Sequence, residues 1–372
     1  MKKTKLGILL KKIKTGKLDA NASCENGKYP FFTCAVEPLK IDSYSYDCEC
    51  VLVAGNGDLN VKYYKGKFDA YQRTYILEVS NTNVLNTRYF YYFMKNYLDV
   101  LRTRTKGGII KYIRLNDIAD AEIPLPPMEE QKKIAARLDT VSDLLAKQKQ
   151  LLAEQDTLIQ SLFYDMFGDL KINSNSYHLC KFEDLFSRIK NGANIKQEKE
   201  KKEGYPITRI ETIWNREIDR KRMGYADIYD HKKYNDYILL DNDILISHIN
   251  SVNHIGKSAL YRKHNDEIII HGMNLLCARP IIQKINPVFI FCFFKTTLFK
   301  EMILSITKPA VNQASFTVSD FKRLSIPVPP LELQEKFAAI VEQIETEKSK
   351  IKSAIAETQT LFNALMAEYF EE

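Results

Sequence analysis

The stretch that decides the fold is Asn116-Asp-Ile-Ala-Asp-Ala-Glu-Ile-Pro-Leu-Pro-Pro-Met-Glu-Glu-Gln131, because the chain contains it twice. The second copy is Ser319-Asp-Phe-Lys-Arg-Leu-Ser-Ile-Pro-Val-Pro-Pro-Leu-Glu-Leu-Gln334, at an offset of 203 residues (319 minus 116). The same offset continues without a gap through the segment that follows, where Leu158, Leu162 and Phe167 correspond to Leu361, Leu365 and Phe370. A repeat of this length without insertions indicates that a structural unit has been duplicated.

Each copy centres on an Ile-Pro-x-Pro-Pro motif, which restricts the backbone around it. Proline fixes its own φ angle and pushes the preceding residue out of the helical region. The motif therefore predicts a stiff, extended hinge directly before a helix. No proline or glycine occurs in residues 128–167 or 331–372. These segments predict two long helices of about 60 Å each, at a rise of 1.5 Å per residue.

Both predicted helices carry a seam of apolar residues that follows a heptad pattern. The residues that represent the two seams are Leu138, Leu145, Leu152 and Ile159 in the first copy, and Val341, Ile344, Ile355 and Phe362 in the second. Lys348 and Thr358 interrupt the second seam with polar side chains. A narrow apolar seam on a polar helix favours another helix as its partner, so we expect an antiparallel pair within the chain. The alternative is that each stripe packs on its own globular domain.

Charge alternates along the chain with the repeat. Residues 1–115 hold 20 Lys and Arg against 10 Asp and Glu, and residues 170–318 hold 23 against 16. The helical segments are acidic, with 5 against 11 in residues 116–169 and 6 against 10 in residues 319–372. A basic globular block is typical of a surface that neutralises phosphates and gains affinity by releasing counterions. The alternative is that the basic residues only increase solubility.

Length and composition narrow the class of protein further. A chain of 372 residues favours two or more domains, and the apolar runs are too short for a membrane span or a signal peptide. We therefore expect a cytoplasmic protein without membrane association. Seven cysteines without a CxxC pair predict free thiols, and the six histidines form no metal-binding motif. The sequence predicts no metal site, no cofactor and no catalytic residues.

The first basic block contains a predicted hairpin followed by a polar, aromatic stretch. A strand over residues 49–54 ends at Gly55-Asn-Gly-Asp58, and a second strand starts at Val61. The residues after it interleave cations, aromatic rings and amides, which suit contacts to phosphates and base edges. Another polar loop lies just before the proline hinge. The predicted DNA-contact residues of this block are Lys65, Tyr71, Gln72, Arg73, Lys106 and Gly107.

The second basic block has a similar order of features. A strand over residues 243–247 leads into a polar loop, and a further polar loop again precedes the hinge. Their position in the repeat makes these loops candidates for contacts to a DNA duplex. The predicted DNA-contact residues of this block are Arg209, Asn253, His254, Lys257, Asn312 and Gln313.

The order of basic block, proline motif with Gln131, long helix, second block and second motif with Gln334 resembles the specificity subunits of type I restriction-modification systems. The stretches 68–75, 243–247 and 254–257 also look like segments of the target recognition domains of that family. The resemblance covers essentially the whole chain. It departs in one place, because Leu333 replaces the glutamate found at Glu130 in the first copy.

The resemblance implies an α+β fold. Two mixed α/β target recognition domains would be joined and spaced by two long antiparallel helices that form an intramolecular coiled coil. The expected limits are 1–122 for the first domain, 123–169 for the central hinge and helix, 170–325 for the second domain and 326–372 for the last hinge and helix. Each domain would read one half of a bipartite site in double-stranded DNA. The helices would dock two DNA adenine methyltransferase subunits, and a motor-nuclease subunit would join through the assembled complex.

Two other functions remain open from the sequence alone. One is a non-catalytic coiled-coil adaptor whose basic domains bind protein or RNA. The other is a nuclease with a scattered Asp, Glu and Lys centre. An adenine methyltransferase is disfavoured, since the Pro-Pro pairs are followed by Met128 and Leu331 and not by an aromatic residue.

Overall fold

In the computed structural model, residues 3–106, 112–173, 175–197, 203–309 and 313–371 are described. Contacts between residues divide the chain into two units, one made of residues 1–151 with 351–372 and the other of residues 152–350. Each unit therefore combines one mixed α/β domain with a part of each long helix. The four predicted domain limits stay a prediction.

The first unit begins with a short strand and a short helix, followed by the strands of a six-stranded sheet. Its elements are β1 (Lys3–Lys5), α1 (Leu6–Leu9), β2 (Lys14–Thr15), η1 (Ala20–Ala22), β3 (Tyr29–Phe32), β4 (Leu39–Ile41), β5 (Tyr46–Ala54), β6 (Val61–Ala70), β7 (Thr74–Leu77), α2 (Thr87–Arg104), α3 (Leu115–Ala119) and β8 (Glu122–Pro124). The helix α2, which we call its domain helix, and the short elements α3 and β8 then lead to the first long helix, α4 (Met128–Phe167). The predicted hairpin is confirmed, because β5 and β6 pair antiparallel.

The sheet of the first domain has the strand order β2-β7-β5-β6-β3-β4 and curls strongly. The end of β6 returns to the segment after β2, where the amide of Gln72 donates to the carbonyl of Leu18 at 2.9 Å. Gly16 allows this approach, since a Cβ atom there would lie 1.9 Å from the carbonyl oxygen of Ala70. The curl brings the turn between β6 and β7 next to segments that are distant in sequence.

The described residues of the second unit form a four-stranded sheet, several shorter strands and loops, and four short α-helices besides the long helices. Its elements are β9 (His178–Lys181), α5 (Phe182–Leu185), β10 (Phe186–Asn191), η2 (Ile210–Thr212), β11 (Ile213–Trp214), β12 (Glu217–Ile218), η3 (Arg220–Arg222), η4 (Lys232–Tyr237), β13 (Ile244–Ser247), β14 (Ile249–Asn250), β15 (Ser258–Leu260), β16 (Leu275–Pro280), α6 (Pro287–Phe293), α7 (Thr297–Ile306), β17 (Lys308–Pro309), β18 (Ala314–Ser315), α8 (Val318–Arg323) and β19 (Ser325–Val328). The second long helix, α9 (Leu331–Phe370), closes the chain. The main sheet has the order β10-β16-β13-β15.

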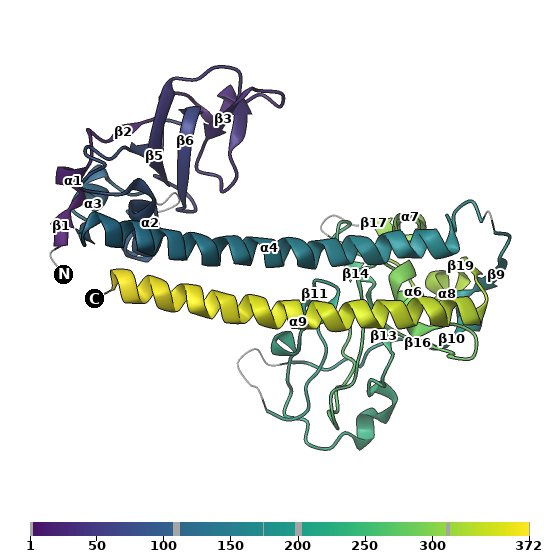
Figure 1. Cartoon of the computed structure of the whole chain (residues 1–372). Helices are drawn as coiled ribbons and strands as arrows, with labels where there is room; N and C mark the ends of the chain where they lie inside the picture. The colour runs from purple at the N-terminus through teal and green to yellow at the C-terminus, as the bar shows by residue number, and fades with distance from the viewer. Residues whose placement is uncertain (1–2, 107–111, 174, 198–202, 310–312, 372) are drawn as a thin grey trace. The chain divides into compact units, whose positions relative to one another are not determined.

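Each proline motif is more than a hinge, because it forms a strand of a two-stranded sheet at the start of a long helix (Figure 1). In the first unit β1 pairs with β8, and Thr4 lies opposite Ile123. In the second unit β9 pairs with β19, and Cys180 lies opposite Ile326. The sequence predicted an extended backbone here but did not predict the partner strand.

A buried glutamine fixes each long helix to its domain at this point. In the first unit, Oε1 of Gln131 accepts a hydrogen bond from the amide of Asn86 at 2.9 Å. Its Nε2 donates to the carbonyls of Pro126 at 2.9 Å and Val84 at 3.0 Å. Gln131 is 1% exposed. Because Asn86 caps the start of α2, this side chain joins α4 to the domain helix.

The second unit repeats this lock with Gln334. Its Oε1 accepts a hydrogen bond from the amide of Asn286 at 2.8 Å, and its Nε2 donates to the carbonyl of Pro329 at 2.8 Å. Asn286 in turn caps α6 by accepting from the amide of Val288. Gln334 is fully buried. We call Gln131 and Gln334 the lock glutamines.

The two long helices pack antiparallel against each other in both units. In the first, the start of α4 contacts the end of α9, where the guanidinium of Arg137 donates to the Tyr369 hydroxyl at 3.2 Å. In the second, Asp156 near the end of α4 forms an ion pair of 2.7 Å with Lys348 of α9. Lys348 is one of the predicted polar interruptions, and it is buried with this partner.

The predicted seam residues lie along these contacts. Those that are buried are Leu138, Leu145, Ile159, Val341, Ile344 and Phe362, and those that are half-buried are Leu152 and Ile355. The predicted fold class of two mixed α/β domains with two long antiparallel helices is confirmed. The alternative in which each stripe packs only on its own domain is wrong. Among the described residues, no helix is long and apolar enough to cross a membrane.

The lock predicts a large difference between two glutamines of the same unit. Gln334→Ala leaves the Asn286 amide and the Pro329 carbonyl buried without partners, which costs about 3 kcal/mol of unfolding free energy. The matched control is Gln155→Leu, because the half-buried Gln155 side chain has an Oε1 without a hydrogen-bond partner among the described residues. We expect this control to change stability by less than about 1 kcal/mol. Urea unfolding followed by the fluorescence of Trp214, the single tryptophan of the chain, measures both. Equal effects of the two substitutions would contradict the lock.

Candidate nucleic-acid interface

In the first domain, the turn between β6 and β7 presents the central group of predicted contact residues. Gln72 and Arg73 are exposed in this turn, and Tyr71 is half-buried. A backbone hydrogen bond fixes this turn to the end of β5, because the amide of Gly55 donates to the carbonyl of Arg73 at 2.8 Å. A Cβ atom on Gly55 would lie 2.5 Å from that carbonyl oxygen, so glycine is required for the contact.

The same glycine brings the pre-hinge loop to this turn. The carbonyl of Gly55 accepts from the amide of Ile113 at 3.0 Å, and Lys106 and Tyr112 exchange two backbone hydrogen bonds of 2.9 Å. The structure thus gathers Arg73 and Lys106, which are far apart in sequence, around the end of β5. Both side chains are exposed. Gly107 lies outside the described residues.

Lys65 is not part of this group. It lies in the middle of β6, opposite Glu49 of β5, and forms an ion pair of 3.3 Å with that carboxylate. Glu49 is several residues away from the end of β5, which separates Lys65 from the Arg73 turn by about 20 Å of extended strand. An exposed pair of this kind is weak and leaves the lysine free to exchange partners.

In the second domain, the loop between β13 and β15 carries three of the predicted residues. Asn253, His254 and Lys257 are all exposed there. The loop is closed by a hydrogen bond from the amide of His254 to the carbonyl of Ser251 at 2.8 Å. Gly256 follows with a φ of +78°, a conformation that favours glycine.

The second pre-hinge loop also meets this loop. Asn250 of β14 pairs with Ala314 of β18, and the exposed Gln313 directly precedes Ala314. The structure therefore places Gln313 beside the start of the loop that holds Asn253. Asn312 lies outside the described residues. In both domains, a turn at a sheet end and the pre-hinge loop come together.

Arg209 lies in a different segment, at the start of η2. Its amide donates to Oγ1 of Thr212 at 2.8 Å, and its Cδ atom lies 2.9 Å from the position of a Cβ on Gly224. Within the described part of the chain, its guanidinium forms no hydrogen bond or ion pair.

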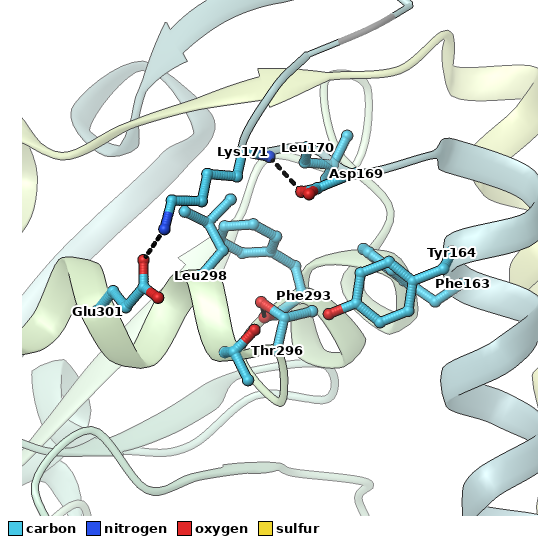
Figure 2. A pocket seen from close by; sticks show the side chains of 10 residues that line it. Phe163, Tyr164, Asp169, Leu170, Lys171, Phe293, Thr296, Leu298 and Glu301 are labelled. Carbon is cyan, nitrogen blue, oxygen red and sulfur yellow. Dashed lines mark hydrogen bonds and ion pairs between the residues drawn. The ribbon is translucent and has the colours of Figure 1, made fainter.

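A cavity of about 160 Å³ lies elsewhere in the second unit, where the end of α4 meets α6 and α7. Figure 2 shows Phe163 and Tyr164 of α4 facing Phe293 and Thr296, with an ion pair of 2.7 Å between Lys171 and Glu301 at its edge. None of the predicted DNA-contact residues lines it. Among the described residues, no group of three or more His, Cys, Asp or Glu side chains could hold a metal ion.

Two histidines near the main sheet of the second domain are buried rather than exposed. His271 is 1% exposed and both ring nitrogens have no hydrogen-bond partner among the described residues. Burial, together with the nearby charges of Arg188 and Lys190, lowers the pKa of His271 to about 3. Burial likewise lowers the pKa of His248 to about 4. Both rings are neutral in the folded domain, so they are packing residues and not phosphate contacts.

Sequence reasoning missed one repeated set of residues because its offset differs from that of the motif. The helices α2 and α6 align at an offset of 200 residues, from Asn86 with Asn286 to Lys95 with Lys295. The shared Asn cap and the Lys nine residues later are the signal that could have revealed it.

Comparisons with known proteins identify relatives of the whole chain. The family model described as "Type I restriction modification DNA specificity domain" matches residues 1–155 and 177–358. The type I restriction enzyme EcoDI specificity subunit of Escherichia coli is 29% identical, and the match covers 99% of this chain and 87% of that protein. The EcoBI specificity subunit of Escherichia coli is 22% identical over 80% of this chain and 68% of the relative.

A solved structure has a similar fold. The S subunit of a type I restriction-modification system from M. genitalium superposes with a TM-score of 0.64 at 19% sequence identity. The match covers 99% of this chain and 96% of that one. At this identity, the likeness shows that the fold is shared.

The buried histidines predict that the second domain loses stability in acid. In the unfolded chain both titrate near pH 6.5, whereas the folded pKa values are about 4 and 3. Below pH 6.5 the unfolded state therefore binds more protons, and the stability present at neutral pH is lost as the pH falls toward 4. At pH 5 we expect a loss on the order of 2 kcal/mol for each histidine.

Urea unfolding at pH 7 and pH 5, followed by Trp214 fluorescence, measures this loss. His271→Leu should remove part of the pH dependence. The exposed His254 provides the matched control, and His254→Ala should leave the pH dependence unchanged. An acid sensitivity that is the same in all three proteins would rule out this assignment.

Proposed function

Because this chain belongs to the family of type I restriction-modification DNA specificity domains, we propose that each of its domains reads one half of a bipartite DNA site. The chain is the component that recognises DNA sequence, and it is non-catalytic. The paired helices α4 and α9 act as the spacer between the two readers. They hold the half-sites at a fixed separation along the duplex.

One observation carries this proposal: in both domains, backbone hydrogen bonds bring an exposed polar turn and the pre-hinge loop together. Gly55 holds the Arg73 turn and the Lys106 loop together in the first domain, and the β14–β18 pair joins the Asn253 loop to Gln313 in the second. Arginine, lysine, glutamine and asparagine are the side chains that contact phosphates and base edges. The surrounding blocks are basic and the long helices are acidic, which favours contact of DNA with the domains.

We further propose that the long helices dock two DNA adenine methyltransferase subunits, one in each unit. Leu158 and Leu361 occupy the same position of the repeat, and they are 49% and 51% exposed. Half-exposed leucines on a helix that already has a partner leave apolar area for a further protein. A motor-nuclease subunit would then join through the assembled complex.

Selection of duplexes from a random pool tests the function. The chain assembled with its methyltransferase subunits should enrich two short blocks of fixed bases separated by a constant gap. Arg73→Ala should weaken the base preference of one block only, by about 1–3 kcal/mol if the guanidinium contacts a base. Lys65→Ala is the matched control, since Lys65 lies apart from the turn, and it should leave the preferred bases unchanged.

Three outcomes separate the competing functions. An adaptor that binds protein or RNA would enrich no duplex sequence. A nuclease would cleave plasmid DNA when the chain alone is incubated with magnesium. Loss of base preference in both blocks of the Arg73 variant would contradict independent readers.

The spacer predicts how the gap responds to helix length. Inserting one heptad after Gln148 of α4 and one after Glu357 of α9 keeps the seam in register, because these positions lie across from each other in the antiparallel pair. Seven residues lengthen each helix by about 10 Å, or about three base pairs of duplex. The selected gap should grow by about three base pairs while both blocks keep their bases. An unchanged gap would show that the helices do not set the distance.

A further inference from the structure

Two lysines occupy equivalent places in the two units. Lys95 lies on α2, nine residues after its capping Asn86, and Lys295 follows α6, nine residues after its capping Asn286. The aromatic residues four positions earlier, Tyr91 and Phe291, also correspond.

The two ammonium groups have similar surroundings. Nζ of Lys95 lies 5.5 Å from the ring centroid of Tyr91 and 5.3 Å from that of Phe362 on α9. Nζ of Lys295 lies 4.2 Å from the ring centroid of Phe291. Lys295 also lines a cavity of about 120 Å³ with Ile159 of α4, and Ile159 corresponds to Phe362 in the repeat. Each lysine thus lies between its domain helix and the C-terminal half of a long helix.

Neither ammonium group forms an ion pair with a described residue. The ammonium groups of Lys95 and Lys295 form no hydrogen bond with a described residue either, and they lie over aromatic rings. Burial lowers the pKa of both ammonium groups. The Glu345 carboxylate is close enough to raise the pKa of Lys295 against this effect, but its ion pair is with Lys348. A cation–π contact offsets only part of the free energy that each ammonium group loses with its hydration. A carboxylate beside it would therefore stabilise the charge further.

On each long helix, an exposed leucine directly precedes, in sequence, the residue that lies near the lysine. Leu361 directly precedes Phe362, the ring beneath Lys95, and Leu158 directly precedes Ile159, which lines the cavity with Lys295. The cavity of Lys295 shares Phe163, Tyr164 and Thr296 with the one drawn in Figure 2. Each unit therefore has an exposed leucine on a long helix, together with a lysine whose ammonium group forms no ion pair with a described residue.

We propose that Lys95 and Lys295 are equivalent anchors that each receive an aspartate or glutamate side chain from one methyltransferase subunit, with Leu361 and Leu158 covered by apolar residues of the same subunit. The inference rests on the proposed docking of two methyltransferase subunits. It names the chemistry of the contact and places one contact in each unit.

The physical reason is that most of the desolvation has already taken place. An exposed lysine must lose its hydration when it pairs, which cancels much of the attraction to a carboxylate. Lys95 and Lys295 are partly desolvated in the free chain, so a carboxylate adds attraction at a smaller additional cost. The residues that dominate an interface typically lie in desolvated pockets, surrounded by contacts that exclude water.

Native mass spectrometry and titration calorimetry with the methyltransferase subunit of the same system test the proposal. The wild-type chain should bind two copies. Lys95→Met or Lys295→Met, which keeps the side-chain length but removes the charge, should weaken one site at least tenfold and leave one tightly bound copy. The double variant should lose both. Lys95→Arg should retain more affinity than Lys95→Met, because it keeps the charge.

The matched control is Lys300→Met, since Lys300 is an exposed lysine of α7 in the same domain as Lys295. It should leave both sites unchanged. Two copies bound with wild-type affinity by the folded double variant, with its circular dichroism unchanged, would overturn the anchors. If the wild-type chain binds no methyltransferase subunit, the docking proposal itself fails, together with the inference built on it.

Discussion

The rest of the structure depends on a buried glutamine at the start of each long helix. Gln131 and Gln334 are almost inaccessible to water, so every polar atom of their amides must find a partner inside the protein. The partners are backbone groups of the domain on one side and of the proline motif on the other. Tilting the helix away from its domain would leave several buried polar groups unpaired, at about 1–3 kcal/mol each. Domain and helix are therefore joined as one piece within each unit.

The proline motif makes this arrangement possible. Its prolines keep the chain extended, which lets the motif pair with the strand that begins each half, and they end immediately before the helix. The duplication is retained at the level of single hydrogen bonds. The amide of Leu6 donates to the carbonyl of Ala121 at 2.9 Å, and that of Phe182 donates to Leu324 at 2.8 Å at the equivalent place. The two sheets differ in strand number and order, however. A constant scaffold with two different sheets fits a protein whose halves read different bases.

Much of this fold could be predicted from the sequence because its signals are local or periodic. The repeat, the proline motifs and the heptad seams gave the long helices and their pairing, and Gly55-Asn-Gly-Asp58 gave the β5–β6 hairpin. The partner strand of each motif could not be predicted, since it lies more than a hundred residues away and has no distinctive composition. The curl of the first sheet also depends on long-range contacts, such as the approach of Gly16 to Ala70.

The types of residue in the candidate interface could be predicted from the sequence, but which of these residues lie close together could not. Exposed cations and amides in polar loops could be recognised, whereas their meeting points depend on backbone contacts through Gly55 and the β14–β18 pair. Lys65 and Arg73 are close in sequence, yet β6 separates them. The equivalence of Lys95 and Lys295 could not be recognised from the offset of 203 that relates the two motifs. The segment between the domain helix and the motif is three residues longer in the second half, so the domain helices are related by an offset of 200.

Native-state hydrogen exchange at the backbone amides of Asn86 and Asn286 tests the central claim most directly. Both residues are helix N-caps, whose amides find no hydrogen-bond acceptor within the helix itself, so any protection must come from donation to the glutamine oxygens. The lock predicts that these two amides exchange as slowly as those of the core strands, and that Gln131→Ala or Gln334→Ala exposes only the amide of its own unit. Exchange in the wild-type chain at the rate of an open loop would contradict the lock.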